Sequence, residues 1–295
     1  MVLFFAVAVH AAENETIPTT LDLTGNIPTT TIFLDEAGDD GVDKSISLQP
    51  NETTLVSCWG TAFDLDGNDD LDNVTSVLYA QSSTREDVDN ASIHYTNSSC
   101  DLTGFETTGT WNCTYNVQYY AENSTWTCIV NITNDDPQYH NDTANETATI
   151  QDLVALDVGN ASIDFGLRAV TVNYTADTEV RVYNEGNVEL DLQLDAFNQT
   201  AAFDDDDANA FNCSIGYIPV NYLRFSLSDG AAYLSSTPMN AAGATATEEF
   251  NLAHQNGGGD DLPTFDATYW AIGIPANIAG TCQGQVMYIG RPGGP

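Results

Sequence analysis

Basic residues are the scarcest feature of this 295-residue chain, which has 6 Lys and Arg against 43 Asp and Glu and a formal net charge of -37. Binding to DNA or RNA depends on cationic side chains that contact phosphates, so this balance excludes nucleic acid as a partner. A salt-adapted or generally solvated surface would show the same acidic excess. The charge therefore constrains the partners and the surface, and it leaves the fold open.

Groups that catalyse reactions are also sparse. The four His (His10, His94, His140 and His254) are scattered without metal-ligand spacing, and the chain has no G-x-S-x-G motif. The CxxC pairs that signal a zinc site are missing as well. Carboxylate pairs of the glycosidase kind cannot be told from chance pairs in so acidic a chain. We therefore expect no enzyme, no catalytic residue and no cofactor other than N-linked glycans and the calcium considered below.

Strong helix formers are few, whereas Thr, Val and Tyr are frequent, and this composition predicts an all-β chain. The length allows two domains of roughly 100 to 150 residues each. Between residues 29 and 134 about seven β-prone runs alternate with turn residues, which is typical of a β-sandwich. These runs are 29–34, 45–48, 53–63, 73–81, 92–96, 111–120 and 125–134.

Alternating residues support strands in both halves. In the run 125–134, one face carries Trp126, Cys128, Val130 and Ile132. In the second half, apolar residues at 188, 190, 192 and 194 alternate with polar ones after an Asn-Glu-Gly-Asn turn. The last two strands are predicted at 269–275 and 284–290, with Cys282 between them.

The predicted organisation is an all-β fold of two tandem immunoglobulin-like β-sandwich domains with an extended N-terminal segment. Residues 135–152 are polar and lack apolar rhythm, which predicts a linker. The complete division is a signal-like apolar segment (1–12), an extended leader (13–28), the first sandwich (29–134), the linker (135–152), the second sandwich (153–290) and a tail (291–295).

The first twelve residues, MVLFFAVAVHAA, form an apolar run of signal-peptide length that is too short to span a bilayer as a helix. One interpretation is a secretory signal cleaved near Ala11 or Ala12. The other is a hydrophobic strand used in assembly. Residues 13–28 are either a leader that pairs with the sheet edge of a neighbouring subunit or a disordered tail. No transmembrane anchor is expected.

Asn-x-Ser/Thr acceptor sites are unusually frequent, which indicates an extracellular glycoprotein. Fourteen are present, whereas chance at this Ser and Thr content would give roughly five. A Thr-rich chain inflates the count, so some of these sites are accidental. They are Asn14, Asn51, Asn73, Asn90, Asn97, Asn112, Asn123, Asn131, Asn141, Asn145, Asn160, Asn173, Asn198 and Asn212.

The six Cys divide into four in the first half and two in the second, which in a secreted chain predicts disulfides within each half. Four Cys allow three pairings. Cys58 with Cys128 is favoured because it joins an early strand to a late one, and this leaves Cys100 with Cys113 to close a local hairpin. The second half then has the pair Cys213 and Cys282.

A strand that contains Cys58 leads into a loop rich in carboxylates. Asp64, Asp66, Asn68, Asp70 and Asp72 offer oxygens at alternate positions around Gly67, as a calcium loop does. The EF-hand pattern fails, since Gly is one place late and the bidentate Glu is missing, so a site at the rim of the sandwich is predicted. A solvated acidic turn without metal is the alternative. A second run, Asp204–Asp207, is interpreted as a solvated loop.

These features carry a resemblance. Cys58, the turn Asp64-Leu65-Asp66-Gly67 and the late Trp126-Thr127-Cys128 resemble the immunoglobulin-like or cadherin-like modules of secreted archaeal and bacterial surface proteins. Antibody domains have a corner Tyr two residues before the second Cys, where this chain has Trp126. The second half is similar to sandwich modules of S-layer-associated proteins and of camelysin-like filament proteins, which assemble by donor strands.

The resemblance implies an archaeal or bacterial surface protein, and we favour an archaeal one. The expected function is a structural subunit of a pilus-like filament or a cell-surface layer, with copies of itself and other cell-surface glycoproteins as partners. The alternative is a monomeric calcium-dependent adhesin or carbohydrate-binding module. Both place the protein outside the cell.

Overall fold

The computed structural model describes residues 29–64, 71–105, 108–134, 142–159, 162–198, 208–239, 250–257 and 262–293. These residues form β-strands and two short 3-10 helices, and the described part of the chain contains no α-helix. The prediction of an all-β fold is confirmed.

The strands of the first half lie between residues 29 and 150, and those of the second half between residues 156 and 292. The first half contains β1 (Thr29–Thr30), β2 (Phe33–Glu36), β3 (Ser45–Ile46), β4 (Thr53–Phe63), β5 (Leu71–Ala80), β6 (His94–Asn97), β7 (Asp101–Phe105), β8 (Thr108–Gln118), β9 (Thr125–Asn134) and β10 (Asp142–Ile150). The second half contains β11 (Leu156–Val158), β12 (Thr178–Asn184), β13 (Leu190–Asn198), β14 (Asn209–Ile215), β15 (Tyr217–Pro219), η2 (Val220–Tyr222), β16 (Leu223–Ser226), η3 (Tyr233–Ser235), β17 (Thr237–Pro238), β18 (Phe250–Leu252), β19 (Thr264–Ile272) and β20 (Ala279–Pro292).

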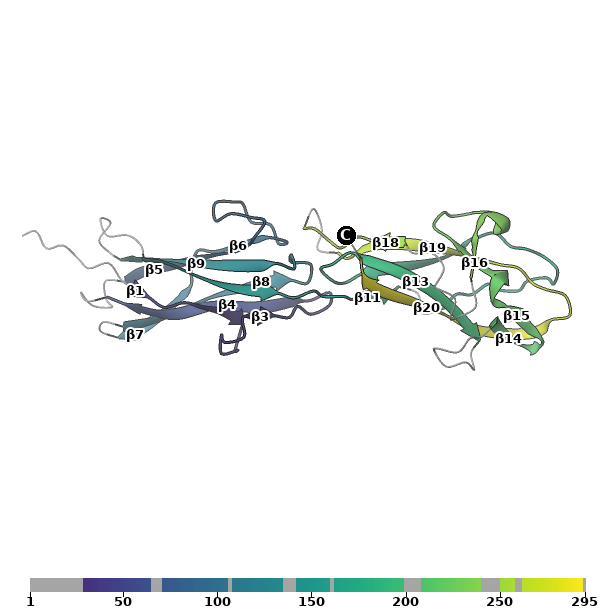
Figure 1. The fold of residues 1–295 in the computed structure, drawn as a ribbon, viewed down its shortest axis with the longest axis horizontal. Coiled ribbons are helices and arrows are strands. Elements are labelled where there is room, and N and C mark those ends of the chain that lie inside the picture. The colour runs from purple at the N-terminus through teal and green to yellow at the C-terminus, as the bar shows by residue number, and fades with distance from the viewer. Residues whose placement is uncertain are drawn as a thin grey trace, which may run out of the picture.

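Four five-stranded sheets result, in two pairs that lie end to end along the long axis of the molecule (Figure 1). The N-terminal sheet pair has the strand orders β1-β4-β8-β7, with β2 also on β4, and β3-β10-β9-β5-β6. The C-terminal sheet pair has the orders β11-β12-β19-β16-β17 and β15-β14-β20-β13-β18. Each pair encloses a hydrophobic core of its own. Their status as two independent domains stays a prediction.

Alternation along β9 and β13 builds these cores. On β9 the side chains of Trp126, Cys128, Val130 and Ile132 are completely buried, as their shared face predicts. On β13 the alternating leucines, Leu190, Leu192 and Leu194, are buried in the second core. Each such side chain contributes about 1.5–3 kcal/mol by leaving water, so these strands bind the two sheets of each pair together.

Trp126 replaces the corner tyrosine of antibody domains and makes an equivalent bond. Its indole Nε1 donates to the backbone carbonyl of Glu122, four residues upstream, at 2.8 Å. A corner Tyr makes the same kind of backward bond through its hydroxyl. Trp126 therefore makes a hydrogen bond that holds the chain at the entrance to β9.

The predicted linker is wrong over residues 142–150. These residues form β10, which pairs antiparallel with β9 and parallel with β3. Its sequence, DTANETATI, is polar because it contributes few side chains to the core, mainly Ala148 and Ile150. The remaining predicted linker residues, 135–141, lie outside the described residues.

The strands differ from the prediction at two further places, one strand that was not predicted and one that is longer than predicted. β7, a five-residue strand beside β8, was not predicted because DLTGF is short and only weakly apolar. The final strand is longer than expected: β20 begins at Ala279 and ends at Pro292, so Cys282 lies within it and the predicted boundary at 290 is two residues early. β20 occupies the centre of its sheet, between β13 and β14.

A buried asparagine joins the two halves. Asn187 is 1% exposed, and its Nδ2 donates to the carbonyl oxygens of Ala121 at 3.0 Å and Gln151 at 3.1 Å. Its Oδ1 accepts a hydrogen bond from the backbone N–H of Leu153 at 2.7 Å. The side chain thus links the second half to the turn before β9, through Ala121, and to the segment after β10, through Gln151 and Leu153.

Candidate assembly and binding surfaces

The predicted calcium loop falls almost entirely outside the described residues. Asp66, Asn68 and Asp70 lie outside them, and the side chain of Asp72 is not described. Asp64, at the end of β4, is buried. The calcium prediction for this loop therefore stays a prediction. The second acidic run, Asp204–Asp207, also lies outside the described residues.

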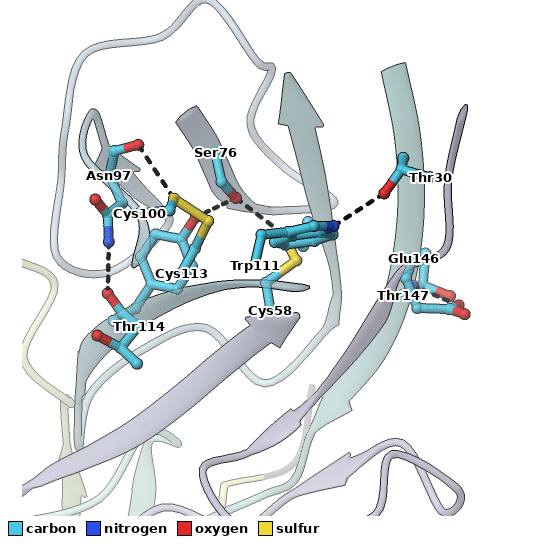
Figure 2. Close-up of a disulfide and its surroundings, with 12 residues drawn as sticks. Thr30, Cys58, Ser76, Asn97, Cys100, Trp111, Cys113, Thr114, Glu146 and Thr147 are labelled. Carbon is cyan, nitrogen blue, oxygen red and sulfur yellow. Dashed lines mark hydrogen bonds between the residues drawn. A yellow bond between two sulfur atoms is a disulfide. The ribbon is translucent and has the colours of Figure 1, made fainter. Parts of the chain in front are cut away.

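Two disulfides lie close together in the N-terminal sheet pair (Figure 2). Cys58 on β4 and Cys113 on β8 are direct neighbours in the ladder. Cys58 is bonded to Cys128 on β9, in the opposite sheet, and Cys113 is bonded to Cys100, the residue before β7. These are the pairs that the sequence analysis favoured. The first crosses the core and the second fastens an outer hairpin.

Two polar side chains, Ser76 and Tyr115, lie beside the disulfide between Cys58 and Cys128. The Oγ of Ser76 lies 3.1 Å from the Sγ of Cys128 and accepts a hydrogen bond from the hydroxyl of Tyr115 at 2.5 Å. Burial raises the pKa of Tyr115, so the hydroxyl keeps its proton and remains a donor. In the second half, Cys213 and Cys282 are paired residues of β14 and β20 and form the third disulfide.

The predicted glycosylation sites are distributed over both halves. Asn14, Asn141 and Asn160 lie outside the described residues. Among the acceptors that the structure does describe, none is fully buried, which is compatible with attachment of a glycan. Asn51, Asn123, Asn145 and Asn173 are exposed, and Asn73, Asn90, Asn97, Asn112, Asn131, Asn198 and Asn212 are half-buried.

An apolar groove opens in the C-terminal sheet pair. It has a volume of about 540 Å³ and lies between strands of the two opposing sheets. Val158 on β11 and Val180 on β12 line one side, and Phe211 on β14 with Val286 and Tyr288 on β20 line the other. We call it the inter-sheet groove. Its lining belongs to the second core, so the groove is an opening into that core and not a surface dimple.

The chain itself partly covers the inter-sheet groove. Ile163 and Phe165 alternate with exposed Asp164 and pack against the core, and Phe165 meets Phe211 edge-on at 6.2 Å. The segment that contains them forms no strand with either sheet. Two apolar side chains therefore fill part of the groove as a strand would, without the ladder hydrogen bonds of a strand.

A second groove lies on the outer face of the first sheet. It has a volume of about 560 Å³ and contains Trp59 and Phe33, whose rings stack at 5.9 Å. Polar side chains surround the rings, including Asp101, Thr103 and Asn112. We call it the Trp59 groove. Phe33 is exposed and Trp59 is half-buried. Such rings can stack on a sugar ring, and the hydroxyl, amide and carboxylate groups beside them can hydrogen-bond to it.

A third feature was missed by the sequence analysis. Asp35 on β2 and Asp39 and Asp43 in the loop to β3 stand at intervals of four residues, and their carboxylate oxygens lie close together. Gly38 and Gly41, both with positive φ, turn the chain between them. The regular spacing of these Asp residues, with glycines between them, is visible in the sequence. The calcium site was instead predicted in the loop after Cys58, because carboxylates are denser there.

Comparison with known proteins gives no family for this chain, since no protein-family model and no curated protein matches it. Among the described residues, no helix has the length and apolar character needed to cross a membrane.

Proposed function

We propose that this protein is a secreted, N-glycosylated structural subunit of an extracellular filament or cell-surface layer, and that it is not an enzyme. Three disulfides support an oxidising, extracellular location. Fourteen acceptor sites support glycosylation there. The acidic surface would keep isolated subunits apart until a specific contact joins them.

The inter-sheet groove is the observation that carries the proposal. An extended apolar strand from another subunit would fit between the sheets, with side chains directed inward and backbone groups paired to a neighbouring strand. Ile163 and Phe165 already occupy part of the groove, so the donor side chains would take the remaining volume beside them. The donor in the proposal is the apolar N-terminal segment of a second copy, residues 1–12 with the leader 13–28. That segment lies outside the described residues.

The N-terminal sheet pair has one end at which β1 begins and an opposite end that contacts the second half, and this arrangement favours donation of the N-terminal segment to another subunit. Thr29, at the start of β1, pairs with Phe63 at the end of β4, whereas Asn51, just before β4, donates to the carbonyl of Glu185 in the second half. The strand β1, which begins at Thr29, therefore lies at the end of the N-terminal sheet pair remote from β20 (Figure 1). A segment that leaves from this end reaches the groove of the next subunit in a head-to-tail row more directly than its own.

Filling the groove tests this assembly. Ser162 is exposed at the groove, and Ser162→Trp should place an indole in it and raise the concentration needed for polymerisation about tenfold or more. Light scattering and electron microscopy of the secreted protein measure the outcome. Ser162→Ala is the matched control, because both substitutions remove the acceptor site at Asn160 and only Trp fills the groove. Unchanged polymer in the Trp variant, or only monomers in the unmodified protein, contradicts the proposal.

The Trp59 groove favours a second candidate function, a monomeric calcium-dependent adhesin or carbohydrate-binding module. Asp39 and Asp101 at its margin disfavour anionic ligands, so a neutral oligosaccharide is the class that fits. Asn112 is itself a predicted glycan acceptor within the groove. A glycan at Asn112 would occupy the groove, so binding has to be measured on protein that lacks this glycan.

Removal of the indole tests this candidate. Trp59→Ala should weaken binding of a neutral oligosaccharide by up to about tenfold, if stacking on the indole contributes as much as an aromatic pair does, about 0.5–1.5 kcal/mol. Titration calorimetry or a glycan array, applied to an Asn112→Gln background, measures the effect. Phe63→Ala removes an exposed aromatic ring from the same strand outside the groove and serves as the control. No oligosaccharide binding in the Asn112→Gln background, or equal loss in both Ala variants, would rule out this site.

A further inference from the structure

The loop that follows β2 brings two carboxylates, Asp39 and Asp43, next to Asp35 on β2. One oxygen from each of Asp35, Asp39 and Asp43 lies within 4.8 Å of the other two. The two turns that allow this contain Gly38 and Gly41, with φ values of 98° and 73°. The loop is therefore shaped so that three side chains of the same charge converge, which costs free energy unless something of opposite charge lies between them.

Asp35 is the residue that separates this cluster from an ordinary acidic surface. Its side chain is 0% exposed, and its Oδ2 is buried without a hydrogen-bond partner. Its Oδ1 accepts a hydrogen bond from the backbone N–H of Glu36 at 2.9 Å, and the backbone N–H of Lys44 also stabilises the carboxylate. A buried carboxylate oxygen without a partner loses its water and gains nothing in return, so it needs either a proton or a cation.

The other two carboxylates are held in position by the backbone. Asp39 Oδ1 accepts the N–H of Asp40 at 2.7 Å, and Asp43 Oδ1 accepts the N–H of Ser45 at 3.1 Å. Each bond uses one oxygen, which fixes the carboxylate and leaves its second oxygen for another contact. Cation sites in proteins are commonly preorganised in this way, with ligand carboxylates hydrogen-bonded from behind.

Among the residues that the structure describes, no basic side chain forms an ion pair with the cluster. Lys44 follows Asp43 directly, but its Nζ is paired with Glu146 at 2.9 Å. Burial raises the pKa of Asp35, and the charges of Asp43 and Asp39 raise it further. Three carboxylates that converge on a buried, unpartnered oxygen form a cluster whose mutual repulsion a cation among them would relieve.

We propose that Asp35, Asp39 and Asp43 form a divalent-cation site, with calcium as the preferred ion. All three ligands are carboxylates, and oxygens within 4.8 Å of one another can share a calcium ion, which binds oxygen at about 2.3–2.6 Å. Calcium takes six to eight ligands in flexible geometry, so water completes the shell on the exposed side. Magnesium requires closer, octahedral ligands and is expected to bind more weakly.

Thermal melting of the full chain tests the site. Calcium should raise the melting temperature of the unmodified protein, and chelation should reverse the rise, because a ligand of the folded state stabilises it. Asp35→Asn should weaken calcium binding about tenfold or more, since it removes the buried charged ligand. Asp40→Asn is the matched control: it removes one charge from the same loop and leaves the three ligands in place. Both variants have the same net charge, so non-specific effects of calcium on the acidic surface cancel.

Terbium luminescence adds a readout of position. The indole of Trp59 lies against Gly41, where an added Cβ would be 3.2 Å from the ring. Terbium in the site should therefore emit when Trp59 is excited. The emission should disappear in Trp59→Phe and in Asp35→Asn, and it should persist in Asp40→Asn.

The outcomes are distinct. Equal calcium binding by Asp35→Asn and Asp40→Asn overturns the proposal and directs attention to the carboxylate loop after Asp64. A melting temperature unaffected by calcium in the unmodified protein also overturns it. Stronger stabilisation by magnesium than by calcium refutes the choice of ion.

Discussion

Replacement of Cys58 and Cys128 by alanine is expected to lower the free energy of unfolding by about 4 kcal/mol. The bond closes a loop of 70 positions, and in the chain-entropy model a loop of this length restricts the unfolded chain to about that extent. Both sulfur atoms are also completely buried between the two sheets, so their removal takes contacts from the core. A domain is typically stable by only about 5–15 kcal/mol, so most of the N-terminal stability is at stake.

Urea unfolding, followed by tryptophan fluorescence, measures this loss. The control is the double alanine variant at Cys100 and Cys113, which opens a loop of only 13 positions and should lose about 3 kcal/mol. It leaves the bond across the core intact. A larger loss in the control than in the Cys58/Cys128 variant would show that the outer hairpin, and not the link between sheets, limits stability.

Substitution of Asn187 by alanine is expected to cost about 3 kcal/mol and to uncouple the two halves. The substitution leaves two carbonyl oxygens, of Ala121 and Gln151, and the N–H of Leu153 without their partner. Each buried polar group that loses its partner costs about 1–3 kcal/mol. Water can hydrogen-bond to those of the three groups that are only partly buried, so the expected total is about 3 kcal/mol and not the full sum. The expected sign of uncoupling is that a single melting transition separates into two.

Asn184 provides a control in the same turn. Its Nδ2 donates to the carbonyls of Val188 and Leu252, and its Oδ1 accepts from Gly186, so all its bonds stay within the second half. Asn184→Ala should destabilise the second half by a similar amount without uncoupling. Calorimetry separates the two cases, and proteolysis between residues 151 and 153 gives an independent measure. Identical behaviour of both variants would mean that Asn187 does not link the halves.

The sequence predicted those parts of the fold that depend on local rhythm or on a cysteine count. The strand at 125–134 was predicted from alternation alone, and its burial pattern matches. The strand at 142–150 was not, because it is held by backbone ladders to β9 and β3 and shows few apolar residues. Pairing by the backbone leaves little trace in side-chain composition.

The candidate sites were harder to predict for a related reason. The inter-sheet groove combines Val158, Phe211 and Tyr288, which are far apart in sequence, and only the stacking of the two sheets brings them together. The carboxylates of Asp35, Asp39 and Asp43 are close together in sequence, and their regular spacing is visible there. What distinguishes them is the burial of Asp35, and burial depends on neighbours that the spacing of the residues does not disclose.

The central position of β20 has a consequence for how the protein is made. A ribosome delivers residues 279–292 after all other strands of the C-terminal sheets, yet β13 and β14 need this strand between them. Until it arrives, both have open edges and part of the second core is uncovered. The second half therefore folds only after synthesis has passed residue 292. Until then, the exposed strand edges of β13 and β14 have to be protected from premature pairing with other chains.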